Sequence, residues 1–270
     1  MGKAVIWGEM TVEEIGKYLE NRPTVILPVG CTEQHGYHLP TSVDILNAEE
    51  MAKRVSSEMG IAVLPTVNYT YSGGELSGTV NVSPGVLALY LEEICLSLAA
   101  QKVRNIIILL GHGGSENTVA LTAFRDMFLR RHRHLDVALA IIPPFFIPDF
   151  VSGDAAEAVR KLHKEGDWHA GKTETSLMLY WAPELVHMDR IQYDSEELLN
   201  MMREDPDAYQ DVQKVVDSPY VGPRVRQKPE VKVGVMGYPE EASAEIGEEI
   251  VRNSLREVVM IIRAIEERPL

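Results

Sequence analysis

Residues 105–114 read Asn-Ile-Ile-Ile-Leu-Leu-Gly-His-Gly-Gly, an apolar run that ends in a glycine-rich turn. A continuous run of this kind is typical of a parallel β-strand that is covered on both faces. Similar runs, with amphipathic segments of helical spacing between them, occur at residues 24–29, 61–65 and 136–142. The alternation predicts an α/β fold, three-layer α/β/α with a mainly parallel central sheet.

The helices of this fold can be assigned from the spacing of apolar residues. They are expected at residues 45–59, 84–102, 116–131, 154–164, 172–181, 194–203 and 240–267. Ser83 is the expected N-cap of the second helix. Residues 143–152 contain three prolines and are predicted to form a loop, and residues 204–239, rich in Pro, Asp and Gly, are predicted to be a long excursion. No change of composition marks a boundary, so residues 1–270 are expected to form a single domain.

The chain is acidic, because its 270 residues contain 26 Lys and Arg against 40 Asp and Glu, a net charge of −14. This charge argues against nucleic acid and anionic membranes as partners. No apolar run approaches the ~20 residues of a membrane span, and the N-terminal segment is not expected to be a secretory signal. Cys31 and Cys95 provide no disulfide framework, which is typical of a cytoplasmic protein.

Possible metal ligands follow two of the predicted strands. Glu33 and His35 come after the strand at residues 24–29, Asp44 stands at the start of the next helix, and His112 follows the strand at residues 105–110. In parallel α/β sheets, ligands gather at the carboxyl ends of the strands. A set of imidazole nitrogens and carboxylate oxygens suits Zn²⁺, Mn²⁺ or Fe²⁺, and the two oxygens of Asp44 could bridge two ions.

Each of these patterns alone has a plainer interpretation. Glu-x-His is usually a pair of solvated side chains, and Gly-His-Gly-Gly after a strand is more often a tight turn or a phosphate cradle. Cys31 is interpreted as a small packing residue rather than a nucleophile, because only the histidines of this region could activate it. The sequence also places histidines in charged, exposed stretches, namely His132, His134 and His163.

A third polar segment spans residues 167–176 and contains His169 and Glu174 before a predicted helix. These residues could belong to a site. Taken alone, they could also form an ordinary helix N-terminus, with Thr173 or Thr175 as the cap and Glu174 favoured by the helix dipole.

Several motifs, taken in order, resemble the creatininase (creatinine amidohydrolase) family. The first is the stretch at residues 27–40, Leu-Pro-Val-Gly-Cys-Thr-Glu-Gln-His-Gly-Tyr-His-Leu-Pro, followed by Asp44. The others are Ser77-Gly78-Thr79, Gly111-His112-Gly113-Gly114, His169-Ala170-Gly171 with Glu174-Thr175-Ser176, and the segment from Gly234 to Gly247. The resemblance covers roughly residues 23–265.

The resemblance implies a three-layer α/β/α hydrolase with two divalent metal ions, often assembled as a homohexamer. Carried over by position, Glu33, His35, Asp44 and His112 are expected metal ligands, with Asp44 bridging. Glu174 is expected to be a further ligand or a base beside the ions. His169 is expected to handle a proton on the substrate or leaving group.

The sequence departs from the family pattern around His112. Leu110 replaces the usual Asn, and Gly113 and Gly114 occupy the positions where creatininase has a large residue and then a ligand Glu. Glu116 is therefore an alternative to Glu174 for completing the second metal site. These differences argue against creatinine itself as the substrate. They leave the assignment to the hydrolase class unchanged.

We expect a metal-dependent amidohydrolase that acts on a small cyclic amide or formamide through a metal-bridging hydroxide. One alternative is a hydrolase that opens a C–C or ring bond of a cyclic diketone in inositol catabolism. Another is a non-catalytic protein that binds metal or a metabolite. A loop at residues 71–75 and Trp168 are expected to line the substrate pocket, although a plain surface or core role is as good an interpretation for Tyr71 and Trp168.

Overall fold

The computed structural model describes residues 2–146, 161 and 164–268. Within these ranges the chain forms a five-stranded sheet in the order β1-β3-β2-β4-β5, in which every neighbouring pair is parallel. The strands are β1 (Val5–Ile6), β2 (Thr24–Val29), β3 (Ala62–Val63), β4 (Asn105–Leu110) and β5 (Ala138–Ile142). The mainly parallel sheet predicted from the apolar runs is confirmed.

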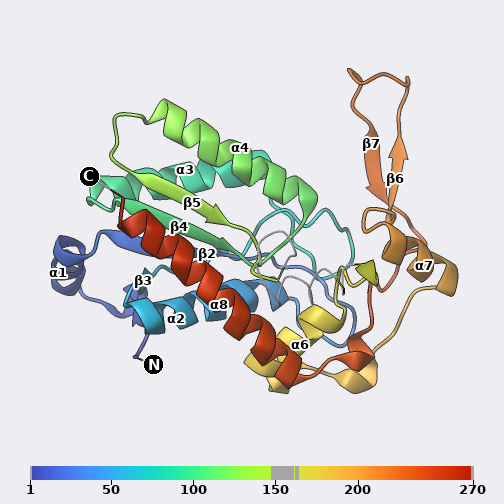
Figure 1. The fold of residues 1–270 in the computed structure, drawn as a ribbon. Helices are drawn as coiled ribbons and strands as arrows, with labels where there is room; N and C mark the ends of the chain where they lie inside the picture. Colours follow the sequence, from blue (N-terminus) through green and yellow to red (C-terminus); the bar gives the residue numbers. More distant parts are fainter. Residues whose placement is uncertain (1, 147–160, 162–163, 269–270) are drawn as a thin grey trace.

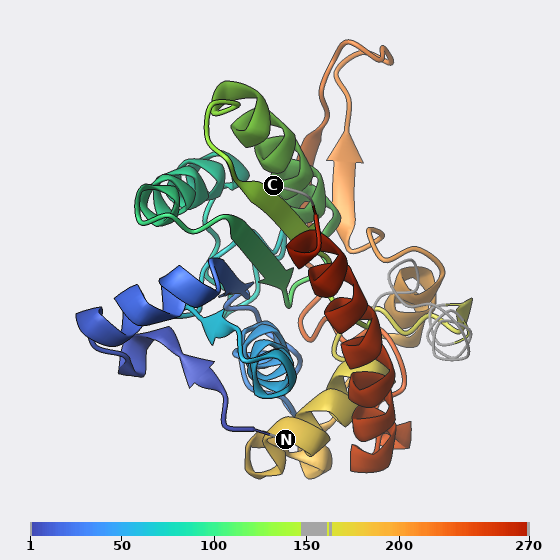
Figure 2. The same cartoon turned by 60° about the vertical axis from the view of Figure 1, so that its left-hand side comes forward.

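Helices cover both faces of the sheet, which gives three layers (Figures 1 and 2). The α-helices are α1 (Val12–Asn21), α2 (Val43–Met59), α3 (Pro84–Ala100), α4 (Ser115–Arg131), α6 (Lys172–Trp181), α7 (Glu196–Glu204) and α8 (Ala244–Glu266). The three-layer α/β/α fold class is therefore confirmed. No helix among the described residues combines the length and apolar composition that a membrane span needs.

The core explains why the strands read as continuous apolar runs. Alternate residues of β2 and β4, such as Leu27 and Ile108, pack with α3 and α4, whereas Ile26 and Ile107 pack with α2 and α8 on the opposite face. Both strands are buried at every position. A strand with two buried faces has no polar side to alternate with, so its sequence is apolar throughout.

Some predicted boundaries were wrong. The strand expected at residues 61–65 is only Ala62–Val63, and the short strand β1 and the helix α1 were not predicted. Helix α1 begins at a capping box between Thr11 and Glu14, a local signal that does not depend on core packing. Ser83 precedes α3, but its side chain makes no capping hydrogen bond. The helix predicted at residues 154–164 lies outside the described residues, apart from 161 and 164.

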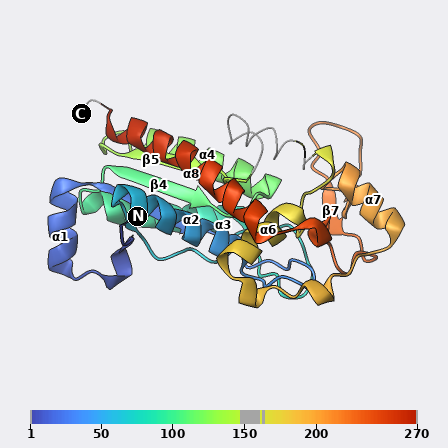
Figure 3. The same cartoon turned by 60° about the horizontal axis from the view of Figure 1, so that its bottom comes forward.

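The predicted excursion at residues 204–239 contains an antiparallel hairpin of β6 (Gln210–Gln213) and β7 (Arg224–Gln227). These strands form a separate two-stranded sheet. Figures 1 and 2 show the hairpin projecting away from the central sheet, and Figure 3 shows it with α7 at the opposite end of the molecule from α1.

Two glycines let the first turn of α2 lie directly against the ends of β2 and β4. A Cβ at Gly30 would lie 2.5 Å from the Cα of Ile45, and a Cβ at Gly111 would overlap the carbonyl oxygen of Asp44. Since real Cβ atoms do not approach backbone so closely, any larger residue would push the helix away from the strands. The two glycines therefore fix the position of Asp44.

Replacing Gly111 with alanine should destabilise the fold because a backbone oxygen, not a movable side chain, occupies the Cβ position. We expect Gly111→Ala to lower the free energy of unfolding by about 3 kcal/mol, the upper part of the range for overpacking. The measurement is urea-induced unfolding followed by circular dichroism.

Gly16 offers a matched control, because it lies on the exposed face of α1 and its Cβ would meet nothing within 4 Å. Gly16→Ala should raise the free energy of unfolding by about 0.5–1 kcal/mol through helix propensity. Equal stability of the two variants would contradict the close approach of α2 to β4.

Candidate metal centre

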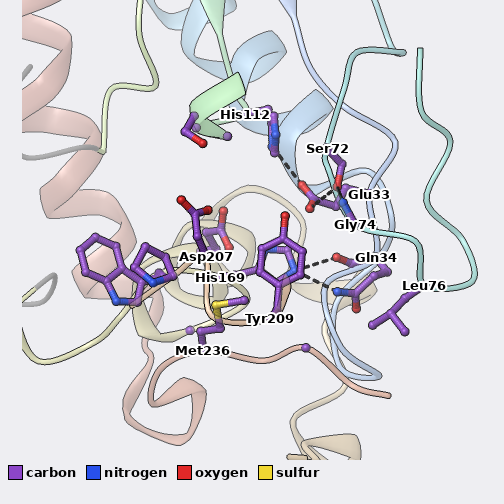
Figure 4. A pocket seen from close by; sticks show the side chains of 18 of the residues that line it. Glu33, Gln34, Ser72, Gly74, Leu76, His112, His169, Asp207, Tyr209 and Met236 are labelled. Carbon is purple, nitrogen blue, oxygen red and sulfur yellow. Dashed lines mark hydrogen bonds and ion pairs between the residues drawn. The ribbon is translucent and has the colours of Figure 1, made fainter. Parts of the chain in front are cut away.

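A cavity of about 280 Å³ opens at the carboxyl ends of β2 and β4. Its lining includes Glu33 from the loop after β2, His112 from the turn after β4, and His169 and Glu174 beside α6. Figure 4 shows Glu33 and His112 close together on one wall, with Asp207 and Tyr209 on another side of the cavity. The site residues predicted from three separate segments therefore meet in one place.

Asp44 lies between two pairs of a histidine and a carboxylate. On one side, His112 Nδ1 is 2.9 Å from Glu33 Oε2 and 3.1 Å from Asp44 Oδ2. On the other side, His35 Nε2 is 3.5 Å from Asp44 Oδ1 and 3.6 Å from Glu174 Oε2. Each oxygen of Asp44 thus faces its own group, and Asp44 itself is 1% exposed. This is the arrangement in which one carboxylate can bridge two cations.

The charges of the two groups depend on one another. Burial lowers the pKa of His112, but the facing carboxylates of Glu33 and Asp44 outweigh it and raise this pKa well above the ordinary value. The carboxylates of Glu174 and Asp44 likewise outweigh the burial of His35 and raise its pKa well above the ordinary value. Burial alone raises the pKa of Glu33, yet the imidazoles of His112 and His169 bring it well below its usual range. The carboxylates therefore hold positive charge beside them.

The donor atoms fit divalent metal ions. Glu33 Oε2, His35 Nε2 and Asp44 Oδ2 are buried and lie in the ion-pair contacts given above, yet none of them makes a hydrogen bond of acceptable geometry in the described part of the chain. Ligand atoms of His35, Asp44 and Glu174 lie within 4.8 Å of one another, and so do those of Glu33, Asp44 and His112. Buried polar atoms without partners are costly, and a bound cation would satisfy them.

Two contacts orient these donor atoms. His35 Nδ1 lies 3.1 Å from the carbonyl oxygen of Glu33, so a His35 ring that gave up its second proton to a cation would keep the other on Nδ1 and present Nε2 to that cation. Ser72 Oγ donates a 2.6 Å hydrogen bond to Glu33 Oε1, which leaves Oε2 toward His112. Ser72 belongs to the predicted pocket loop, and the lining includes Ser72 and Gly74.

Asp167 organises the start of α6, where the plainer interpretation of the sequence had Thr173 or Thr175 as the cap. The N-cap position is Gly171, and the side chain of Asp167 accepts hydrogen bonds from the backbone nitrogens of Lys172 and Thr173, at 2.6 and 2.9 Å. The threonine cap of the plainer interpretation is not formed, because the preceding loop brings a buried carboxylate to the helix N-terminus.

The loop before α6 places His169 and Glu174 in the cavity. Ala170 has φ +50°, a left-handed conformation that is unfavourable for alanine, and its backbone N–H donates to Glu174 Oε2 at 2.6 Å. His169 Nε2 lies 2.9 Å from the carbonyl oxygen of Gln34 and 3.1 Å from the side-chain nitrogen of the same residue, so it donates to the first or accepts from the second according to its tautomer. The rings of His169 and His35 lie 4.4 Å apart.

Glu116, the predicted alternative to Glu174, lies in the first turn of α4 and also lines the cavity. Among the residues that the structure describes, none of the close groups of possible ligands includes Glu116, whereas Glu174 lies with His35 and Asp44. Cys31, expected to be a packing residue, is fully buried, and its Sγ lies within 4.8 Å of ligand atoms of the group around His112. Burial raises the pKa of its thiol to about 11.

The outer part of the cavity contains residues that the sequence did not reveal as functional. Asp207 and Tyr209 come from the base of the hairpin, and Met236 from the segment before α8. Trp168, for which a pocket role was one interpretation, lines the cavity. The excursion at residues 204–239 has no apolar period, so the only available signal was an aromatic and an acidic residue within a Pro-rich loop.

Residues 8–262 match the creatininase family, described as creatinine amidohydrolase. The creatinine amidohydrolase of Pseudomonas putida is 32% identical over 71% of this chain and 77% of its own. A mycofactocin precursor peptide peptidase of Mycolicibacterium smegmatis is 34% identical over 63% of this chain and 62% of its own. A 3-dehydro-scyllo-inosose hydrolase of Thermotoga maritima is 27% identical over 68% of this chain and 58% of its own.

Solved creatininases have the same fold. A mutant creatininase complexed with creatine superposes with a TM-score of 0.77 at 28% identity, covering 99% of this chain and 100% of its own. Two further creatininase structures, one described as Zn-Zn type and one as Mn, each have a TM-score of 0.76. With the family match running along almost the whole sequence, this chain belongs to the creatininase family of hydrolases.

Proposed function

We propose that this creatininase-family hydrolase is a metal-dependent amidohydrolase that cleaves a small cyclic amide or formamide. The observation that carries the proposal is the position of Asp44 between the group of Glu33 and His112 and the group of His35 and Glu174. Two ions held there would supply a water that ionises near neutral pH and a Lewis acid for a carbonyl oxygen. Zinc, manganese and iron all suit nitrogen and oxygen donors, and relatives described as Zn-Zn and Mn support the first two.

The chain's own residues would bind and protonate the substrate. The cavity of about 280 Å³ accepts a small molecule whose carbonyl approaches Glu33 and His112. His169 lies at the cavity wall, and we assign it the donation of a proton to the leaving nitrogen. Glu174 holds the backbone of the residue next to His169 through the Ala170 N–H. We propose catalytic roles for His169 and Glu174, and these positions support them.

A second candidate reaction is the hydrolysis of a C–C or ring bond in a cyclic diketone, for which the same centre would polarise a ketone. The relative described as 3-dehydro-scyllo-inosose hydrolase favours keeping it.

We also propose that residues 1–270 form a single domain, since the family match spans residues 8–262. The buried free thiols of Cys31 and Cys95 support a cytoplasmic location, and we propose a homo-oligomer.

The metal proposal predicts that His112→Ala loses bound metal while the chain stays folded. We expect the metal content of the purified protein, measured by atomic emission, to fall by at least half, and hydrolysis to fall by roughly 100-fold or more. Circular dichroism reports whether the fold persists.

His134 gives the matched control, because it is exposed after α4 and far from the cavity lining. His134→Ala should keep wild-type metal content and activity. Full metal content and activity in His112→Ala would rule out the assigned centre.

The cavity lining also bears on the charge of the substrate. Among the described lining residues there is no Lys or Arg, whereas Glu116 and Asp207 are carboxylates outside the ligand groups. Burial and the neighbouring Glu116 raise the pKa of Asp207. Burial, with Glu116 and Glu33 nearby, raises the pKa of Tyr209 to about 12, so its hydroxyl remains a donor. We propose that the substrate presents a neutral or cationic group to this wall and carries no phosphate or carboxylate there.

Two ring amides that differ by one carboxylate test the substrate charge. The metal-loaded wild type should bind dihydrouracil at least roughly tenfold more tightly than dihydroorotate, measured by calorimetry, and Asp207→Lys should shift that ratio roughly tenfold toward dihydroorotate. Asp217→Lys, the same charge change in an exposed loop outside the cavity, should leave the ratio unchanged. Equal ratios in all three proteins would refute charge selection by Asp207.

A further inference from the structure

Cys31 lies within the metal centre proposed above, on which this inference rests. The residue comes two positions after the end of β2, close to the first turn of α2. Its Sγ and one possible ligand atom each of Glu33, Asp44 and His112 all lie within 4.8 Å of one another. All four residues are buried. The other group of possible ligands around Asp44 contains no sulfur.

The surroundings of Cys31 differ from those of Cys95, the second cysteine of the chain. Cys95 lies on the inner face of α3 and belongs to the hydrophobic core between that helix and the sheet. Cys31 belongs to none of the hydrophobic clusters formed by the residues that the structure describes. The charged groups that act on its thiol are instead those of His112, Asp44 and Glu33. Apolar packing therefore accounts for the burial of Cys95 but not for that of Cys31.

Buried polar atoms around the sulfur also indicate a missing partner. Glu33 Oε2 and Asp44 Oδ2 face His112 Nδ1 at 2.9 and 3.1 Å, yet neither oxygen makes a hydrogen bond of acceptable geometry in the described part of the chain. Thr70 is fully buried, and its side chain lowers the pKa of the Cys31 thiol. Its Oγ1 has no other partner among the described residues. A cation would satisfy both oxygens, and the Thr70 hydroxyl would donate to a sulfur that binds the cation.

A sulfur ligand changes which ion this position prefers. Zn²⁺ binds thiolate, imidazole and carboxylate at about 2.0–2.3 Å, so donor atoms around one tetrahedral ion lie about 3.3–3.8 Å apart. Four atoms within 4.8 Å of one another need only a modest inward movement to reach that arrangement. Thiolate is a soft ligand that favours Zn²⁺, whereas carboxylate oxygens suit Mn²⁺ and Mg²⁺.

We propose that Cys31 is a fourth ligand of the ion bound by the group of Glu33, Asp44 and His112, and that its thiolate makes this position selective for Zn²⁺ over Mn²⁺. The thiol proton leaves to solvent as the bond from sulfur to the ion forms. The position beside His35 has nitrogen and oxygen donors alone and accepts Mn²⁺ more readily. The two positions therefore differ in the ion that they prefer.

Cobalt tests for the sulfur ligand, because Co²⁺ substitutes for Zn²⁺ and absorbs differently when a thiolate binds it. The full chain is stripped of metal with a chelator and loaded with Co²⁺, and the bound cobalt is measured by atomic emission. We expect bound cobalt together with a sulfur-to-cobalt charge-transfer band in the near ultraviolet. Bound cobalt without this band would overturn the role of Cys31 and leave the metal centre standing. Failure to bind cobalt would overturn both.

Two cysteine variants assign the band to one sulfur. Cys31→Ser should lose the charge-transfer band while it retains at least one cobalt ion. Cys95→Ser is the matched control, because Cys95 is equally buried but lies in the hydrophobic core, and it should keep the band. A band that persists in Cys31→Ser would contradict the proposal.

X-ray absorption of the zinc-loaded wild type gives evidence that needs no variant to fold. The zinc spectrum should contain a sulfur neighbour at about 2.3 Å in addition to nitrogen and oxygen. A spectrum explained by nitrogen and oxygen alone would refute the sulfur ligand.

Competition between Zn²⁺ and Mn²⁺ tests the selectivity. We expect Cys31→Ser to lower the preference of the chain for Zn²⁺ over Mn²⁺, measured as the ratio of the two dissociation constants, by roughly tenfold or more. Cys95→Ser should leave this ratio unchanged. An equal ratio in the wild type and in Cys31→Ser would contradict selection of the ion by the thiolate.

Discussion

The close approach of the first turn of α2 to the ends of β2 and β4 is the constraint on which the site depends. Gly30 and Gly111 provide the space, and Asp44 consequently lies with both oxygens at the edge of the sheet. The histidines and other carboxylates approach it from the loops after the strands and from α6. A shift of α2 by the thickness of one methyl group would separate Asp44 from both of its neighbouring groups.

Gathering these groups is costly for the fold itself. Glu33, Asp44 and Glu174 are buried beside His35 and His112, and buried charges are expensive unless a partner compensates them. In the arrangement described, protonated imidazoles compensate the carboxylates, as the raised pKa values of both histidines indicate. Cations in the same place would release these protons, so metal binding would couple proton release to stability at this centre.

The sequence was most informative where local pattern and tertiary packing impose the same requirement. The runs at residues 24–29 and 105–110 are apolar because both faces of each strand are buried, and the chemistry at their ends follows from parallel topology. Short elements were less predictable. Strand β3 has only two residues, too few to show a period, and the cap of α6 comes from Asp167, which is placed by a loop rather than by helix spacing.

The cavity residues with metal-binding side chains could be predicted from the sequence, whereas the residues of its outer wall could not. Metal-type ligands stand next to the ends of strands and helices, where a residue's position follows from regular structure. The outer wall comes from Asp207 and Tyr209 in an excursion without period, so no sequence pattern could bring it to the cavity. A substitution in that wall would leave Asp44 on α2 and His112 after β4 in place. The chain is similar to relatives described as acting on creatinine, a peptide precursor and an inosose, and one fold can carry several such activities when the residues around its site differ.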